Sequence, residues 1–402
     1  MIGIVFWLSL IMIFYTYIGY PVLIFLLARL KKPDLYPSDF SPDVCLLIVA
    51  YNEESCIAEK LDNTLELEYP AGHIKLMVAA HGSDDRTVEI VESYADRGVK
   101  LSYRPEREGK LAAISHAMKG ISADIVVFSD ANNFYDSETL RQLLLPFSDV
   151  HVGAATGAKV ILAEDESSLG SSEGLYWKYE SFIKKQETRF SSCVGSSGEI
   201  FAIRRELFEP PQKNMVNDDF YMLMQTLRKG YRVVYVPAAR SYERISSSQQ
   251  DEIIRRKRIS AGRYQSLWFA RKNLPINKPV ILWQVFSHKI LRLALPFVLL
   301  TAFAVNFLAL LPGFSRFQPE LVYLGAPYNW LFFLLQLIFY LSAFIGFFLP
   351  GKSKAAKLFY LPTFLVSSNY AVLLGLFHFL GHKDPAVWEK VNRHQETGGE
   401  NE

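Results

Sequence analysis

Cysteine is scarce in this sequence, and no nucleic-acid-binding motif is present. Only Cys45, Cys56 and Cys193 occur among 402 residues. Three scattered cysteines make neither a disulfide framework nor a zinc site, and they fit a reducing compartment. The net charge is only +2, and the basic residues form no separate arm. These absences predict a protein that has no nucleic-acid partner and is not held together by disulfides.

Charged residues are absent from four long stretches of the chain. These stretches are residues 1–28, 293–315, 321–351 and 358–381. A helix needs about 20 apolar residues to cross the bilayer core, so each stretch is long enough. The first stretch has no basic segment before it and exceeds the roughly 7–15 apolar residues of a signal peptide, which favours an anchor. The sequence therefore predicts four membrane-spanning helices.

Basic residues beside these stretches predict the orientation in the membrane. Lysine and arginine gather on the cytoplasmic side of membrane helices. In this chain they follow the first stretch, precede the second and fill the loop after the third: Arg29, Lys31, Lys32, Lys289, Arg292, Lys352, Lys354 and Lys357. This distribution predicts a multi-pass protein of the cell (inner or plasma) membrane with its central region in the cytoplasm and both termini outside. The last stretch contains the polar residues "SSNY", so a re-entrant segment that does not cross the membrane is an alternative to the fourth span.

The predicted spans divide the chain into four parts. We expect residues 1–30 to be an N-terminal anchor, residues 31–288 to be a cytoplasmic domain, and residues 289–381 to be a membrane region with three spans. Residues 382–402 form a polar tail.

Apolar runs of strand length alternate with helical patterns in the first half of the cytoplasmic part. The runs are residues 44–50, 74–80, 100–104 and 124–130, and the helical segments are 55–68, 87–95, 111–120 and 137–147. This alternation predicts an α/β fold with a mainly parallel sheet and helices on both faces. Thr87 is expected to cap the second helix. No G-x-G-x-x-G opens the first helix and no G-x-x-x-x-G-K-[ST] occurs, which argues against the common dinucleotide and phosphate-binding loops.

Polar clusters follow three of the predicted strands. They read "AYNEE" at 50–54, "HGSDDRT" at 81–87 and "SDANN" at 129–133. Each cluster alone is typical of a turn. Parallel strands end at the same edge of a sheet, however, and open α/β sheets bind ligands there. The three clusters together therefore predict one site at that edge.

Two later segments each allow a structural and a functional interpretation. Asp218 and Asp219 begin a helical pattern, where acids satisfy unpaired N–H groups or one of them acts as a general base. The basic run 251–264 includes Arg255 and Arg258. It suits either anionic lipid or the phosphate oxygens of a bound ligand.

Residues 40–290 resemble the family 2 glycosyltransferases, inverting enzymes with a GT-A (Rossmann-like) fold, of the membrane-anchored bacterial type. "AYNEE" matches the family's first motif, and "HGSDDRT" resembles its D-G-S-T-D-x-T stretch. "REGKLAAISHA" (107–117) is similar to its G-K segment, and Asp130-Ala131-Asn132 to its D-x-D motif. Asp218-Asp219 stands for the acidic pair that supplies the base, and residues 255–259 stand for the [QR]-x-x-R-W motif.

The resemblance implies a role for each matching residue. It implies that a nucleotide-sugar donor is bound by Ala50, Tyr51, Asn52, Glu53, His81, Lys110, Asp130, Arg255 and Arg258. It implies a divalent cation, Mg²⁺ or Mn²⁺, on Asp130 and Asn132, and a catalytic base at Asp219 beside Asp218. The segment "GSSGEIFAIRRELF" is similar to the family's acceptor side, whose first residues here are Gly195, Ser196, Ser197 and Gly198. The expected activity is sugar transfer to a lipid-linked or glycan acceptor in cell-surface polysaccharide or glycoconjugate biosynthesis.

Three positions depart from the family pattern. His81 replaces an aspartate that pairs with the uracil ring, and Asn132 replaces the second acid of D-x-D, keeping an oxygen ligand but losing a charge. Ile259 replaces the tryptophan that stacks on the acceptor in processive polysaccharide synthases, which favours a lipid-linked acceptor. Two alternatives stay open: a processive synthase with a transmembrane channel, and a pseudo-enzyme that binds nucleotide without catalysis.

Overall fold

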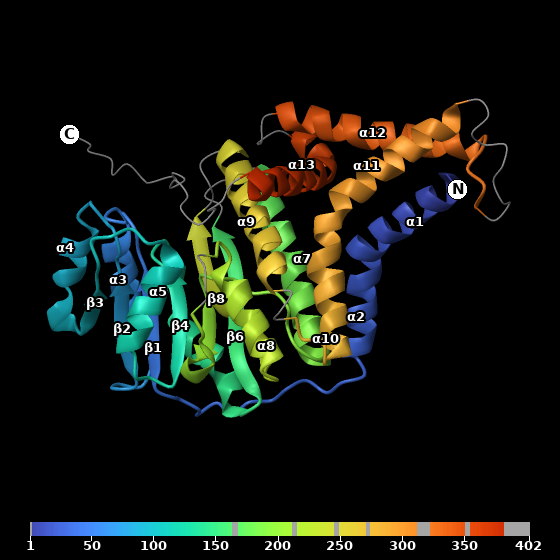
Figure 1. The fold of residues 1–402 in the computed structure, drawn as a ribbon. Helices are drawn as coiled ribbons and strands as arrows, with labels where there is room; N and C mark the ends of the chain where they lie inside the picture. The colour runs from blue at the N-terminus through green and yellow to red at the C-terminus, as the bar shows by residue number, and fades with distance from the viewer. Residues whose placement is uncertain are drawn as a thin grey trace.

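The computed structural model describes residues 2–162, 168–210, 215–244, 249–270, 274–311, 322–349 and 354–381. Figure 1 shows a sheet domain on one side and long helices on the other, with α7 (Ser168–Phe190) between them. The predicted polar tail, 382–402, lies outside the described residues.

One mixed sheet forms the core of the domain. Among the described residues it has eight strands, in the order β3-β2-β1-β4-β7-β6-β8-β5. Neighbours among β3, β2, β1 and β4 are parallel, as the sequence predicts, whereas β7 is antiparallel to both β4 and β6. The strands are β1 Val44–Val49, β2 Ile74–Ala79, β3 Val99–Ser102, β4 Ile125–Asp130, β5 Asn133–Tyr135, β6 Val152–Leu162, β7 Phe201–Arg204 and β8 Arg232–Arg244.

Helices cover both faces of this sheet, as predicted. Strand side chains alternate between the faces: Cys45 and Leu47 of β1 join one hydrophobic cluster, and Leu46 and Ile48 join the other. The first cluster includes residues of α5, α8 and α10, and the second includes residues of α3, α4 and α6. These helices are α3 Ile57–Leu65, α4 Thr87–Glu92, α5 Lys110–Ala117, α6 Thr139–Leu144, α8 Asp218–Arg228 and α10 Pro279–Val285.

Four helical segments among the described residues are long and apolar enough to cross a membrane: Ile2–Ala28, Pro279–Leu310, Tyr328–Phe348 and Leu358–Gly381. They comprise α1 (Ile2–Phe14) with α2 (Tyr20–Ala28), α10 with α11 (Leu291–Leu310), α12 (Tyr328–Phe348) and most of α13 (Lys354–Gly381). The second segment begins earlier than the predicted residue 293, so the proposed domain boundary at residue 288 falls within a continuous helical stretch.

The first two apolar segments each contain one π-helical turn, at Tyr15–Gly19 and Phe286–Ile290. The two turns lie side by side. The Tyr15 hydroxyl is 2.8 Å from the Ser287 hydroxyl and accepts a hydrogen bond from the Trp283 indole at 3.0 Å. Figure 1 shows α1 beside α11 above these turns and α2 beside α7 below them. The turns therefore join the apolar helices to one another where the segments reach the sheet domain.

The last helix, α13, packs on α9 (Gln249–Ala270) of the sheet domain. Its polar "SSNY" stretch lies within an unbroken helix, and the Ser368 hydroxyl accepts a hydrogen bond from Arg256 Nη1 at 2.8 Å. The Asn369 amide donates to the Tyr17 hydroxyl at 2.9 Å. The polar letters in this apolar segment are thus explained by contacts with α9 and with the first helix.

Candidate active site

The clusters that follow β1 and β2 are joined directly to each other. Asn52 has a left-handed backbone (φ 54°), and its side chain donates to Asp84 Oδ1 at 2.6 Å and accepts from the Asp84 backbone at 3.0 Å. The Glu53 backbone N–H donates to Thr87 Oγ1 at 2.8 Å. Ala50, before them, is buried. Asn52 and Glu53, both expected to bind the donor, therefore also hold this edge of the sheet together.

Thr87 does not cap α4, contrary to the expectation. It is the first residue of the helix, and its own N–H donates to Asp85 Oδ1 at 2.9 Å. The Asp85 carboxylate supplies the cap, while the Thr87 hydroxyl accepts from Glu53.

His81 lies buried at the end of β2. It is 5% exposed, and neither ring nitrogen has a partner among the described residues. Its ring centroid is 5.1 Å from that of His116. Burial, with a smaller contribution from His116, lowers the pKa of His81 below its ordinary value. A neutral imidazole has one donor and one acceptor, so His81 offers both to a ligand.

An aromatic and cationic pair stands close to His81. The Arg107 guanidinium lies 4.1 Å from the centre of the Tyr51 ring. Gly82, next to His81, has φ +69°, and a Cβ there would come within 2.7 Å of Arg107 Cα. Glycine is therefore required for the loop that contains Arg107 to approach the end of β2. The sequence analysis missed Arg107, although it belongs to the charged segment "RPERE" just before Lys110.

Acidic side chains from β4 and α8 converge on one lysine. Lys110 Nζ, at the start of α5, is 2.8 Å from Asp130 Oδ1 and 3.6 Å from Asp218 Oδ2. Burial by itself lowers the pKa of the Lys110 ammonium, but the carboxylates of Asp130 and Asp218 outweigh it and raise that pKa. Segments about 90 residues apart in sequence thus meet at the carboxyl edge of the sheet.

Asp218 is the most enclosed of these acids, with 6% of its surface exposed. Burial raises the pKa of its carboxyl group, Lys110 opposes this shift, and Asp219 and Asp130 reinforce it. A carboxyl whose pKa is raised on folding destabilises the protein at pH values above that pKa. The ionised form of Asp218 therefore carries an electrostatic cost in the folded protein.

We expect Asp218→Asn to raise the melting temperature at neutral pH. The penalty of burying the charge is absent below about pH 3.9, grows as the pH rises through the raised folded-state pKa, and is complete above it. Each 1 kcal/mol removed raises the melting temperature of a domain of this size by about 2–4 °C. Calorimetry at about pH 4.5 and pH 7.5 should show the larger gain at pH 7.5.

Asp96→Asn is the matched control, because Asp96 is exposed far along the chain from this cluster. It should change little at either pH. A loss of stability in Asp218→Asn at neutral pH would mean that attraction to Lys110 exceeds the burial cost.

Asp219 faces the predicted acceptor segment. Its Oδ2 accepts a hydrogen bond from the Ser196 hydroxyl at 2.9 Å, and a Cβ on Gly198 would lie 3.4 Å from Asp219 Cβ. Ser197 is buried, and its backbone N–H donates to Thr156 Oγ1 at 3.1 Å. A Cβ on Gly195 would come within 2.8 Å of Lys289 Nζ. Small residues therefore let this segment pass close to Asp219.

The predicted metal ligands differ in their surroundings. Asp130 ends β4 within reach of Lys110, and Asn132 is half-buried in the turn before β5. The described residues contain no group of three or more His, Cys, Asp or Glu able to hold a metal ion. Mg²⁺ is usually bound through one or two carboxylates together with substrate phosphates. The oxygen donors of Asp130 and Asn132 fit such a cation, and the ammonium of Lys110 already lies beside Asp130.

The basic residues of α9 are divided between neighbours. Arg255 and Arg258 are half-buried, and Arg256 turns to α13, 4.7 Å from the Phe364 ring centre. Asn217, just before the acidic pair, donates to the Ile259 carbonyl at 3.1 Å. Helix α9 is therefore attached directly to the start of α8.

Lys60 is a buried residue that the sequence analysis missed. Its Nζ donates to the Asn133 carbonyl at 2.7 Å and lies 4.2 Å from the Tyr135 ring centre. Burial lowers the pKa of Lys60 to about 7. It fixes β5 and the turn that holds Asn132. Its position in the sequence could have predicted this burial, because Lys60 follows Ile57 by three residues and shares the buried face of α3 with Ile57 and Leu61.

A buried ionic network under the acceptor segment was also missed. His288 Nδ1 is 2.8 Å from Glu187 Oε1, and its Nε2 is 3.1 Å from Glu180 Oε2. The Tyr20 hydroxyl donates to Glu187 Oε1 at 2.5 Å, and the Val194 N–H donates to Glu187 Oε2 at 3.1 Å. The network thus joins the first two apolar segments to α7 and to the residue before Gly195.

Comparison with known proteins identifies relatives of this domain. The profile of the family described as "Glycosyltransferase like family 2" matches residues 42–262. The poly-beta-1,6-N-acetyl-D-glucosamine synthase of Staphylococcus aureus (strain COL) is 26% identical over 218 residues, which are 52% of this chain and 51% of that protein. An N-acetylglucosaminyltransferase of Rhizobium sp. (strain N33) is 27% identical over 222 residues, 51% of this chain and 49% of that protein. The chain spans about half the length of these curated relatives.

A solved structure resembles nearly the whole chain. The mannosyltransferase PcManGT from Pyrobaculum calidifontis, in complex with GDP-Man and Mn²⁺, superimposes with a TM-score of 0.66 at 20% identity. The likeness covers 93% of this chain and 99% of that one. It confirms the expected GT-A fold.

Proposed function

The chain belongs to the glycosyltransferase-like family 2, and from that premise we propose that it is a membrane-bound inverting glycosyltransferase. It moves a sugar from a nucleotide-sugar donor to a lipid-linked or glycan acceptor in cell-surface polysaccharide or glycoconjugate biosynthesis. One observation supports this most directly: Lys110, Asp130 and Asp218 meet at the carboxyl edge of the sheet, and Asp219 beside them faces the glycine- and serine-rich acceptor segment.

The donor lies along the edge from His81 to Asp130 in this proposal. His81 offers its unpaired ring nitrogens to the nucleobase, and the Tyr51 ring with Arg107 provides an adjacent surface for stacking. Lys110, Arg255 and Arg258 supply positive charge to the diphosphate, which becomes more negative as the sugar leaves. Arginine suits this task because its planar fork matches phosphate oxygens.

A divalent cation, Mg²⁺ or Mn²⁺, would be held by Asp130 and Asn132. When bound, it neutralises charge on the leaving diphosphate. The residues of the chain do the remaining work. Asp219 accepts the proton of an acceptor hydroxyl, whose oxygen forms a bond to the anomeric carbon as the bond to the diphosphate breaks. One such displacement inverts the anomeric centre. Ser196 orients the Asp219 carboxylate through its 2.9 Å hydrogen bond.

Four long apolar helices favour a membrane-embedded or lipid-linked acceptor. In this proposal the sheet domain is cytoplasmic, as the basic residues beside the predicted spans indicate. Ile259 is half-buried, and its carbonyl accepts from Asn217, so this position offers no aromatic platform for a polymer. A processive synthase is the second candidate, because one relative is named a polysaccharide synthase.

A donor panel tests the proposal. Membranes containing the full chain are incubated with nucleoside-diphosphate sugars, with N-acetylglucosamine and mannose donors first, and products are identified by mass spectrometry. We expect release of a nucleoside diphosphate and one added sugar on an extracted lipid or glycan. A ladder of long products would favour the processive synthase. Donor binding without any turnover across the panel would leave only the non-catalytic alternative.

His81→Ala should weaken donor binding and leave the chemical step largely intact. Loss of one buried hydrogen-bonding partner costs about 1–1.5 kcal/mol, so we expect KM for the donor to rise about 10-fold with little change in kcat. Steady-state kinetics of the variant and of His151→Ala, an exposed histidine, provide the comparison. Equal effects on kcat and kcat/KM would assign His81 to the reaction centre instead.

A further inference from the structure

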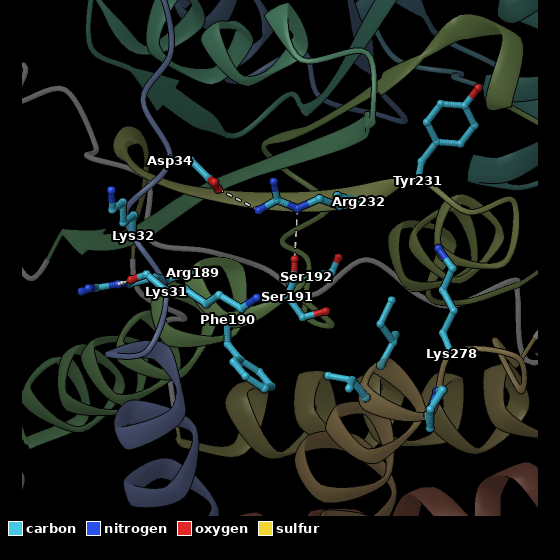
Figure 2. Close-up of a pocket in the computed structure, with 13 residues that line it drawn as sticks. Lys31, Lys32, Asp34, Arg189, Phe190, Ser191, Ser192, Tyr231, Arg232 and Lys278 are labelled. Carbon is cyan, nitrogen blue, oxygen red and sulfur yellow. Dashed lines mark hydrogen bonds and ion pairs between the residues drawn. The ribbon is translucent and has the colours of Figure 1, made fainter.

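A basic pocket lies at the end of the domain opposite the carboxylates. It has a volume of about 550 Å³ and is formed by residues 31, 32, 34, 189–192, 231–232 and 278–281 (Figure 2). Its wall includes Arg232, the first residue of β8. Strand β8 is parallel to β6, which has the same direction as β4 because β7 is antiparallel to both. Arg232 is thus at the amino edge of the sheet, whereas Asp130 is at the carboxyl edge.

The pocket lies where two apolar segments have their basic ends. The first segment ends at Ala28, three residues before Lys31, and the second begins at Pro279, directly after Lys278. Figure 2 shows the linker after the first segment, the end of α7 and the start of α10 around one space. The pocket therefore belongs to the junction between the sheet domain and its apolar helices.

Cations outnumber acids in the pocket by five to one. The cations are Lys31, Lys32, Arg189, Arg232 and Lys278, and the acid is Asp34. Asp34 is paired with Arg232 at 2.7 Å. Arg189 Nε donates to the Lys31 carbonyl at 2.9 Å, and Lys278 Nζ donates to the Gly230 carbonyl at 2.7 Å. A carbonyl orients a cation but does not neutralise it, so an unneutralised positive charge remains.

Exposed apolar side chains flank these cations. Leu26 and Leu30 precede the lysines and are 53% and 77% exposed, while Ile276 and Val280 on either side of Lys278 are 71% and 40% exposed. Leu30 and Ile276 lie outside the two apolar segments, so a water-soluble phosphate compound would leave them in water. A phosphate attached to acyl chains would cover them, and this combination of charge and apolar surface favours a lipid.

We propose that this pocket binds the phosphate-bearing headgroup of an anionic phospholipid. The proposal rests on the membrane association proposed above. Basic pockets between membrane helices on the cytoplasmic side bind such headgroups, and each lysine near an anionic surface contributes about 1 kcal/mol, or about 5-fold in affinity. A volume of about 550 Å³ is within the usual range for a small-molecule site. The bound headgroup would tie the linker, α7 and α10 together at the ends of the apolar segments.

The test compares a two-lysine variant with a matched control. The full chain in mild detergent is titrated with short-chain phosphatidylglycerol, and the shift in melting temperature gives the apparent affinity. We expect Lys31→Gln/Lys32→Gln to weaken this affinity about 30-fold. Lys100→Gln/Lys119→Gln, which removes two exposed lysines that do not line the pocket, should match the parent. Equal affinity in the two double variants would overturn the proposal.

Two further titrations identify the source of the phosphate. Short-chain phosphatidylcholine should give no saturable shift, and a shift equal to that of phosphatidylglycerol would show binding to acyl chains alone. Inorganic phosphate should bind far more weakly. If it saturates at the same concentration as the lipid, the pocket is a free-anion site and the lipid assignment is wrong. Sugar transfer measured on the same samples separates this result from the proposed activity, since lipid binding with no transfer would refute only the latter.

Discussion

Asp219→Asn is expected to reduce sugar transfer by about 10²–10⁴-fold, because that is the usual contribution of a positioned general base. The amide keeps the shape of the carboxylate and still meets the Ser196 hydroxyl, but it cannot accept the acceptor's proton. Donor binding should be unchanged, because Asp219 faces the acceptor segment. The measurements are single-turnover transfer at saturating donor and, separately, equilibrium binding of the nucleotide sugar.

Asp96→Asn makes the same chemical change at an exposed site and should retain full activity. Normal turnover in Asp219→Asn would remove Asp219 from the mechanism. If Asp218→Asn alone lost activity, the neighbouring carboxylate would be the base, and the hydrogen bond from Ser196 would only hold the loop.

Asp130→Ala should reduce transfer by at least about 100-fold, since electrostatic support of the leaving group is worth several kcal/mol. The change also frees Lys110 from its 2.8 Å partner. Asp130→Asn is therefore assayed beside it, because the amide retains an oxygen ligand and a partner for Lys110. We expect the amide variant to lose less activity than the alanine variant.

Removal of divalent cations provides the parallel test on the unaltered chain. Excess chelator should stop transfer, and added Mn²⁺ or Mg²⁺ should restore it. Asp130→Ala should need a higher metal concentration, or show no rescue at all. Full activity of the parent chain in excess chelator would exclude the proposed cation, and Asp130 would then act through Lys110 alone.

The parallel half of the sheet could be predicted because its signals are local. Strands β1, β2 and β4 are short apolar runs, and each is followed by a polar cluster and then a helix. The antiparallel strand β7 has only four residues, Phe201–Arg204, and its direction is set by pairing with β4 and β6, each more than 35 residues away in sequence. Such long-range pairing leaves no periodic pattern, so the sequence predicts the mainly parallel sheet but not the antiparallel strand β7 within it.

The sequence could predict that the acids meet, because parallel strands end at the same edge of a sheet. It could not predict the surroundings of each acid. Asp218 and Asp219 are adjacent identical residues, and the sequence offers a helix cap or a base for either. In the structure Asp218 is enclosed beside Lys110, whereas Asp219 accepts from Ser196. This difference arises from the rotation of α8 against α5 and the acceptor segment, which depends on packing of the whole domain. The buried His288 network escaped notice for the same reason, since Glu180 and Glu187 acquire their partner from a segment about 100 residues away.

Helix α13 lies so close to α9 that the contact leaves no room for a side chain at Gly375. A Cβ on Gly375 would come within 2.6 Å of Ser260 Cβ and 2.8 Å of the Ala261 backbone nitrogen. One turn earlier on α9, Arg256 is bonded to Ser368, and the Ile259 carbonyl holds Asn217 beside the acidic pair. The last apolar helix is thus connected through α9 to the proposed reaction centre. In the proposed membrane-bound enzyme, we expect a tilt of that helix to shift Asn217 and the adjacent Asp218 and Asp219, so that membrane thickness would affect the rate of sugar transfer.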